Sequence, residues 1–284
     1  MTTIVRRPSP GPALRTAASY LLMVLLALLL TIPAIWLMIT SLKLPTEYLS
    51  YPLRFLPNVP QWSNYVVALT RIPFARYAGN TLLLSTVFSV LTVLTSAMAG
   101  FAFSRINAPG RNFLFTIIVA LLIVPGIITL IPQFVVFAKL KLTDSYWPWV
   151  LWGLSASPFH IFLFRQFFST FPKDLEDAAE VDGCGPFRIF AQIFMPNALP
   201  AVATSFILNF VYVWGDWLTP SIFLTDMNTT LAVKLNSGYV DPHSHPLIPT
   251  TLAACVLYTL PLVVLFFVGQ RYLVRGVVTS GMKG

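Results

Sequence analysis

The chain has 284 residues, of which 56% are hydrophobic and only 10% are charged. An ordinary soluble domain carries about 25% charged residues, so this composition excludes a typical globular domain and favours a single helical bundle in lipid. The formal charge of +8 comes from basic residues that are scattered along the chain and never form a long run, which is not typical of a nucleic-acid-binding surface. The two cysteines, Cys184 and Cys255, form no metal-binding or redox motif.

Long stretches without charge predict the membrane-spanning helices. Six windows of at least 20 residues contain no Asp, Glu, Lys or Arg. About 20 apolar residues cross a bilayer core, and backbone groups in lipid must be paired internally, so each window predicts one helix. The predicted spans are 17–40, 80–103, 113–138, 145–164, 198–222 and 249–272. The predicted fold class is therefore all-α, a polytopic membrane protein with six transmembrane helices.

Basic residues near the span ends predict the orientation of the chain. With the N-terminus in the cytosol, eleven basic residues lie on the cytosolic side and seven on the outer side, so both termini are expected inside. The first window is too long for a signal peptide and lacks a following small-residue cleavage site, so it is expected to stay in the membrane. The expected organisation is a cytosolic segment 1–16, a six-helix transmembrane domain 17–275 and a cytosolic tail 276–284.

The long cytosolic loop 165–197, between the fourth and fifth spans, carries half of the acidic residues. Five of ten lie within nine positions: Asp174, Glu176, Asp177, Glu180 and Asp182. Asp174 is expected to cap a short helix, whose positive end the other carboxylates of the first turn stabilise. Gly183 suits the end of that helix, and Pro186 suits the first residue of the next one.

Two interpretations of this short helix remain open. It could be an ordinary solvated connector between two spans. It could instead be a docking element, because Ala178 and Ala179 have almost no side chain and permit the close approach of a cytosolic partner.

The run from Leu175 to Gly183 resembles the EAA loop of binding-protein-dependent ABC permeases, most closely the carbohydrate branch that includes the smaller permease of the maltose transporter. Asp177 stands where the family usually has Glu, and Cys184 stands where a small residue such as Ala is common. The likeness covers nearly the whole chain, and it continues in Ile193–Pro196, Pro200, Asn64-Tyr65, Asn80-Thr81, Ala99–Arg105, Trp214–Trp217 and Gly276–Gly284.

The resemblance implies a permease subunit of an ATP-driven importer in the cell membrane, which forms half of a sugar path by alternating access. Its implied partners are a sister permease, two ATPase subunits, an extracytoplasmic solute-binding protein and membrane lipid, but no nucleic acid. The chain lacks a phosphate-binding loop of the Gly-x-x-x-x-Gly-Lys-Ser/Thr type, so ATP and Mg²⁺ are expected on the ATPase subunits, with no cofactor or catalytic residue in this chain.

The same resemblance implies two sets of ATPase-contacting residues. The coupling residues are Asp174, Glu176, Asp177, Ala178, Ala179, Asp182, Gly183 and Pro186. A second contact is expected in the tail, at Ser280, Gly281 and Lys283, and a frayed terminus is the alternative there.

Polar residues of the fifth span predict a solute path. Ser205, Asn209, Tyr212 and Asp216 are spaced so that they share one helix face. Hydroxyl and amide groups beside an aromatic ring suit a sugar, but interhelical hydrogen bonding is the alternative. Gln133 lies on a second polar face, in the third span, where Pro125 and Pro132 can kink the helix. The small hydroxyls of the second span, Ser85, Ser89, Thr92 and Ser96, predict helix packing.

Two other classes of membrane protein fit the sequence less well. A secondary transporter usually keeps ionisable residues inside its bundle, and these span interiors are almost free of charge. A rhomboid-like protease would use the serine of Gly153-Leu154-Ser155-Ala156, but the motif lacks its final glycine. On one continuous helix, His160 would lie about 140° around from Ser155, so the two could not form a dyad.

Overall fold

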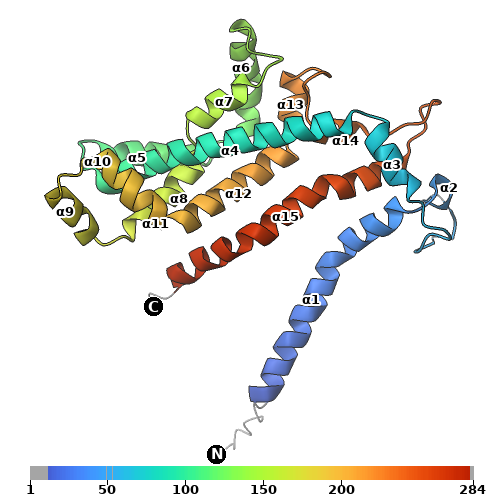
Figure 1. Cartoon of the computed structure of the whole chain (residues 1–284), viewed down its shortest axis with the longest axis horizontal. Helices are drawn as coiled ribbons and strands as arrows, with labels where there is room; N and C mark the ends of the chain where they lie inside the picture. Colours follow the sequence, from blue (N-terminus) through green and yellow to red (C-terminus); the bar gives the residue numbers. More distant parts are fainter. Residues whose placement is uncertain (1–11, 49, 53, 282–284) are drawn as a thin grey trace, which may run out of the picture. The chain divides into compact units, whose positions relative to one another are not determined.

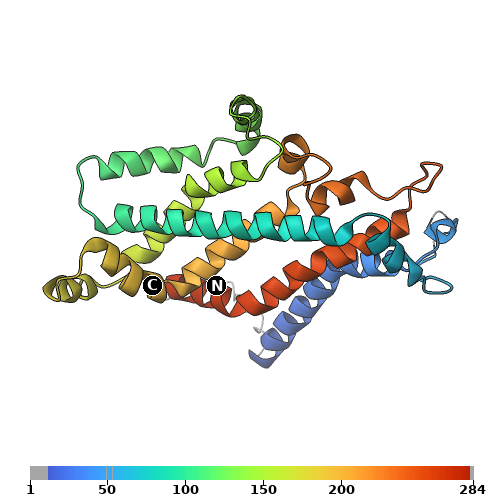
Figure 2. The same cartoon turned by 45° about the horizontal axis from the view of Figure 1, so that its top comes forward.

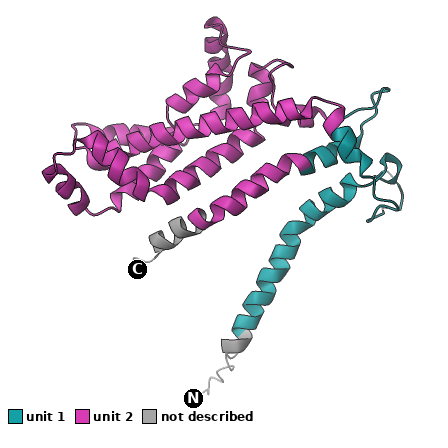
Figure 3. Cartoon of the chain, viewed as in Figure 1, with its two compact units in different colours: residues 1–68, 239–256 teal, residues 69–238, 257–284 magenta. Residues whose placement is uncertain are grey.

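The computed structural model describes residues 12–48, 50–52 and 54–281, with side chains described only between 15 and 272. Within these residues the chain is helical, and its only extended pairing is an isolated antiparallel bridge between Val240 and Pro246. The all-α prediction is thus confirmed. The chain forms two compact units (Figure 3). The first consists of the chain up to residue 68 together with residues 239–256, and the second consists of residues 69–238 together with the chain from 257 onward.

The first unit contains α1 (Pro12–Ser41), α2 (Pro45–Tyr48), most of α3 (Ser63–Thr70) and the start of α15 (Ile248–Gly281). The second unit contains the rest of α15 and α4 (Phe74–Arg105), α5 (Arg111–Leu121), α6 (Gly126–Lys139), α7 (Trp147–Leu154), α8 (Pro158–Ser169), α9 (Asp174–Val181), α10 (Pro186–Ile189), a π-helical segment (Phe190–Phe194), α11 (Met195–Asn197), α12 (Leu199–Gly215), α13 (Leu218–Phe223) and α14 (Leu231–Ser237) (Figure 1).

Three helices of the described chain are long and apolar enough to cross a bilayer, and they lie in α1, α4 and α15. Two further pairs reach this length only if a bend is counted within the span. The bend is 98° between α5 and α6, and 79° between the 186–197 segment and α12. The prediction of one unbroken helix in each window is therefore wrong for 113–138, 145–164 and 198–222.

Proline explains two of these breaks. Pro125 has no backbone N–H and disfavours helical geometry in the residue before it, and α6 begins directly after it. Pro158 opens α8 in the same way, after Ala156 has turned to a positive φ of 60°. In the window 198–222, α12 ends at Gly215, and the next residue, Asp216, has an extended backbone with ψ of 113°. Pro132 lies inside α6 without ending it.

Helix α4 is the central element of the second unit and packs most extensively against α8, α12 and α7 (Figure 2). Glycines on both sides of these contacts allow the close packing. A Cβ at Gly100 of α4 would lie 2.6 Å from Phe164 Cβ in α8, and a Cβ at Gly153 of α7 would lie 2.8 Å from Leu91 Cβ in α4. The hydroxyl stripe of α4 is buried, which confirms the packing prediction: Ser85, Ser89, Thr92 and Ser96 are at most 1% exposed.

The loop after α1 in the first unit is ordered by two charged side chains. Lys43 Nζ donates to the carbonyl of Arg54 at 2.7 Å. The carboxylate of Glu47 accepts hydrogen bonds from the backbone N–H groups of Leu44 and Asn58, both at 3.1 Å, and these bonds hold the pKa of Glu47 below its usual value. These hydrogen bonds therefore tie together the described parts of the loop on either side of residues 49 and 53.

Gly100→Ala should destabilise the protein, because its new methyl group would overlap the α8 backbone and Phe164; such overpacking costs about 1–3 kcal/mol. Gly79→Ala, in the same helix, is the matched control, since a Cβ there meets open space and alanine favours helix. Thermal unfolding of the detergent-solubilised protein should show a lower Tm only for Gly100→Ala. Equal Tm values would contradict the close packing of α4 and α8.

Candidate coupling surface and solute path

The acidic helix α9 begins one residue earlier than expected. Lys173 occupies the N-cap position with helical φ and ψ of −65° and −31°, and its carbonyl accepts the N–H groups of Glu176 and Asp177 at 2.8 and 3.0 Å. The prediction that Asp174 caps the helix is therefore wrong, because Asp174 already lies inside the first turn. Its carboxylate and those of Glu176 and Asp177 still lie next to the positive end of the helix dipole.

The end of α9 agrees with the sequence prediction. Gly183 has a positive φ of 76°, which glycine adopts without the steric cost that a Cβ would bring. Cys184 N–H donates to the Ala179 carbonyl at 2.9 Å, and Gly183 N–H donates to the Glu180 carbonyl at 3.0 Å. These two bonds form a Schellman motif. Pro186 then opens α10, also as predicted.

The two alanines of α9 lie in different environments. Ala179 is 6% exposed and belongs to the buried cluster described below, whereas Ala178 is exposed. The outward face of α9, which we call the acidic face, consists of the exposed residues Asp174, Asp177, Ala178, Val181 and Asp182. A helix that is fixed on one face and open on the other can present that open face to a partner.

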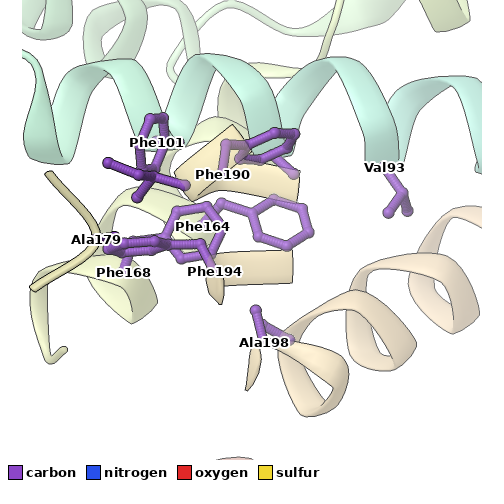
Figure 4. Packing of buried hydrophobic residues seen from close by; sticks show 11 residues of the cluster. Val93, Phe101, Phe164, Phe168, Ala179, Phe190, Phe194 and Ala198 are labelled. Atoms are coloured by element: carbon purple, nitrogen blue, oxygen red, sulfur yellow. The ribbon is translucent and has the colours of Figure 1, made fainter. Parts of the chain in front are cut away.

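The base of α9 is an aromatic cluster formed by α4, α8 and the π-helical segment (Figure 4). Its rings are at most 7% exposed: Phe101, Phe164, Phe168, Phe190 and Phe194. Phe101 and Phe194 pack edge to face with centroids 4.9 Å apart, a geometry that aromatic quadrupoles favour. Since Ala179 packs in the same cluster, the cluster joins α9 to α4, α8 and the π-helical segment.

A buried ion pair also joins α9 to α4. Arg105 Nη1 lies 2.8 Å from Glu176 Oε1, and the side chains are 8% and 18% exposed. Burial raises the pKa of Glu176, and the nearby Arg105 guanidinium opposes this shift without cancelling it. Sequence reasoning assigned Glu176 to the partner-contacting set, but in the structure its carboxylate points inward. The candidate residues predicted from the sequence did not include Arg105, because its only signal was that of a basic residue at the end of a span.

The polar residues of the fifth span do not share one environment. Ser205 and Asn209 are 0% and 5% exposed, whereas Tyr212 is 69% exposed. Asp216 lies beyond the end of α12, where Oδ1 accepts the N–H of Thr219 at 3.0 Å. Helical spacing placed the residues on one side of α12, but neighbouring helices cover only the first part of that side.

Ser205 and Asn209 form a buried polar group with a residue of α8. Ser205 Oγ and His160 Nδ1 are 2.8 Å apart, and Asn209 Nδ2 donates to the Ser205 carbonyl at 3.1 Å. From the sequence, His160 was weighed only as a partner of Ser155 in a protease dyad. In the structure Ser155 Oγ donates instead to the Trp152 carbonyl at 2.8 Å. The signal for His160 was an ionisable residue within a charge-free window.

The remaining candidate residues lie elsewhere. Gln133 in α6 donates through Nε2 to Thr129 Oγ1 at 3.2 Å, one helical turn away. Helix α15 continues to Gly281, so the backbone of Ser280 and Gly281 is helical, past the predicted end of the span at residue 272. Lys283 lies outside the described residues. Across the described part of the chain, no group of three or more His, Cys, Asp or Glu residues could hold a metal ion.

Residues 91–279 match the family of binding-protein-dependent transport system inner membrane components. The chain belongs to this family. The predicted family resemblance is confirmed, and so is the location of this permease as a multi-pass protein of the inner membrane. The family is one of transport proteins, and the names of the relatives given below are those of permeases.

Two relatives illustrate how far the similarity extends. The permease is 31% identical to an arabinooligosaccharides transport system permease protein of Halalkalibacterium halodurans, over 91% of this chain and 93% of that one. It is 29% identical to a lactose transport system permease protein of Rhizobium radiobacter, over 99% of both chains.

The fold is also shared with a chain of a solved transporter. The structure superposes with a TM-score of 0.80 on a chain from a bacterial ABC transporter involved in the import of the acidic polysaccharide alginate. The match covers 95% of this chain and 100% of that chain at 21% sequence identity. It therefore supports a shared fold.

Gly183→Ala should loosen the end of α9, because an L residue in the left-handed region costs about 1–2 kcal/mol. Hydrogen exchange at the N–H groups of Gly183 and Cys184, measured on the whole permease, should become faster. The matched control is Gly185→Ala, where φ is −75° and a Cβ meets open space. Unchanged exchange in Gly183→Ala would show that the Schellman motif is not what holds this turn.

Proposed function

We propose that this permease forms half of the translocation path of an ATP-driven sugar importer, and that the acidic face of α9 seats on an ATPase subunit. The observation that carries the proposal is the environment of α9. One side of this helix is anchored by Ala179 and Glu176, while the opposite side exposes carboxylates and the small side chain of Ala178. A solvated connector would not need such anchoring.

The proposed topology has six spans with both termini in the cytosol. Helices α1, α4 and α15 supply three of them, and the bent pairs α5–α6 and 186–197 with α12 supply two. We assign the sixth to α7 and α8 together, on either side of the break at Ser155–Ser157. This order places α9 in the cytosol between the fourth and fifth spans, where a cytosolic ATPase can reach it.

The partners follow from the family and from what the chain lacks. A sister permease would complete the path, an extracytoplasmic binding protein would deliver the solute, and two ATPase subunits would bind ATP and Mg²⁺. Closure of the ATPases would push on loop 165–197 and drive alternating access. The tail residues Ser280, Gly281 and Lys283 are proposed as a second ATPase contact.

A sugar is the proposed solute. The printed names of two relatives describe transport of arabinooligosaccharides and of lactose. Of the four polar residues predicted in the fifth span, two remain accessible to a solute: Tyr212, which is exposed on α12, and Asp216 beyond the end of this helix. Gln133 on α6 is a further polar candidate. Ser205 and Asn209 would act from behind this surface, by holding α12 against α8.

Ala178→Trp should uncouple transport, because the indole would keep α9 from approaching the ATPase while the exposed position leaves the bundle intact. We expect uptake in proteoliposomes to fall by about tenfold or more, within the usual range of coupling between two sites. The ATPase subunit should also co-purify poorly. Ala138→Trp, an exposed alanine near the far end of α6, is the control. Normal uptake by Ala178→Trp would exclude the docking assignment.

Tyr212→Ala should weaken solute passage without affecting assembly. Aromatic contacts are worth about 0.5–1.5 kcal/mol, so the apparent KM for uptake should rise by about 2- to 13-fold. Val211→Ala truncates the exposed neighbouring side chain and should leave KM unchanged. Asn209→Leu should instead lower the Tm, since it breaks the buried group around Ser205. If Tyr212→Ala transports with the wild-type KM, the path must lie on other helices.

A further inference from the structure

Arg105, the last residue of α4, is held by three different parts of the second unit. Its Nη1 lies 2.8 Å from Glu176 Oε1 in α9. Its Nη2 donates to the carbonyls of Phe168 and Phe171, at 2.5 and 2.6 Å. Its Cζ lies 5.1 Å from the centre of the Phe194 ring, in the π-helical segment. A single side chain therefore contacts α9, the end of α8 and the segment that leads into α12.

The chemistry of this position suits arginine alone among the basic residues. The carbonyls of Phe168 and Phe171 lie in the last turn of α8 and just beyond it, at the end of the helix that carries the partial negative charge of its dipole. The planar guanidinium has five N–H groups, so it can reach these carbonyls and a carboxylate at once, whereas a lysine ammonium is a point charge. At 8% exposure the side chain is largely removed from water, and such a charge is tolerated only when it is paired.

The contact between Arg105 and Glu176 is mainly electrostatic. The two groups are within ion-pair distance, but within the described residues Glu176 Oε1 accepts no well-aligned hydrogen bond. The other charges that act on Glu176 come from its own helix and its N-cap, and they are Asp177, Glu180 and Lys173. The ion contact with Arg105 thus links Glu176 of α9 to α4, a membrane-spanning helix.

We propose that Arg105 is a positioning residue that transmits movement of α9 to α4 and α8, and so makes ATP-driven displacement of the coupling loop move the spans. The inference rests on the proposed seating of α9 on an ATPase. Helix α4 is 32 residues long and packs against α7, α8 and α12, so a displacement applied at its last residue acts on most of the second unit. Packed interiors transmit such shifts because they deform little.

Without Arg105, α9 would lose its ion contact with α4 and keep the apolar contact of Ala179 with the aromatic cluster. Aromatic and aliphatic contacts are non-directional, and they permit sliding of one element over another. An ion pair combined with two carbonyl hydrogen bonds fixes both distance and orientation. The consequence is a specific one: loss of Arg105 should separate ATP hydrolysis from transport while leaving the acidic face available to the ATPase.

The test uses the complete transporter in proteoliposomes, with uptake and ATP hydrolysis measured on the same sample. Arg105→Met should lower the solute moved per ATP hydrolysed by about tenfold, a typical factor for coupling between sites, while the ATPase subunit still co-purifies. Arg105→Lys should fall between this variant and the wild type. The control is Arg111→Met, because Arg111 Nη1 donates to the Ile106 carbonyl and to Asn107 Oδ1, both in the loop that precedes it.

A second variant keeps the test decisive if Arg105→Met folds poorly. Arg105→Met removes the ion-pair partner of the largely buried Glu176 carboxylate, so Arg105→Met/Glu176→Gln should assemble better than Arg105→Met. Its transport per ATP should nonetheless remain low, because the link is still missing. Transport per ATP should also be low in Glu176→Gln alone. The two substitutions would then be non-additive, as expected for residues in direct contact.

The outcomes separate this inference from the proposed function. Wild-type transport per ATP in Arg105→Met or in the double variant, with the ATPase bound, would overturn the inference and leave docking intact. Loss of ATPase binding in the double variant would also overturn it, because Arg105 would then shape the docking surface itself. Failure of the docking proposal would be seen separately, as normal uptake and normal ATPase binding in Ala178→Trp.

Discussion

The close approach of α4 and α8 at Gly100 is the contact on which the rest of the second unit depends. A Cβ at Gly100 would lie 2.6 Å from Phe164 Cβ and 2.9 Å from Arg165 N, so only glycine permits this distance between the helices. Polar contacts support the same arrangement nearby, since Ser157 N–H donates to Ser96 Oγ at 3.0 Å. In lipid, where the hydrophobic effect does not drive helices together, small residues and such hydrogen bonds provide the association.

This approach also determines the environment of the coupling loop. Because α8 lies against α4, Phe168 packs with Phe101, and the carbonyls at the end of α8 come within reach of Arg105. The aromatic cluster and the ion pair then anchor α9 from the inside. Figures 1 and 2 show α9 at the end of the unit where α4 ends. Anchoring on one face and exposure on the other are consequences of the same packing.

Local signals in the sequence predicted much of this structure. The charge-free windows identified the long apolar helices α1, α4 and α15, because a chain in lipid must bury its backbone polar groups in helices whatever its tertiary contacts. Gly183 and Pro186 marked the end of α9 and the start of α10, since their backbone preferences act within a few residues. Pro125 was recognised as able to kink its helix, but the size of the bend depends on neighbouring packing and not on proline alone.

The sequence by itself determined where the long apolar helices α1, α4 and α15 lie and which residues are spaced to share a helix face. Only the tertiary structure decided what covers each face. Periodicity cannot distinguish Ala178 from Ala179, or Asn209 from Tyr212, because burial depends on a second helix whose position is set by distant residues. The same reason explains why Glu176 was predicted to face a partner: its ion contact is with Arg105, 71 positions earlier in the chain, and the fold alone brings the two together.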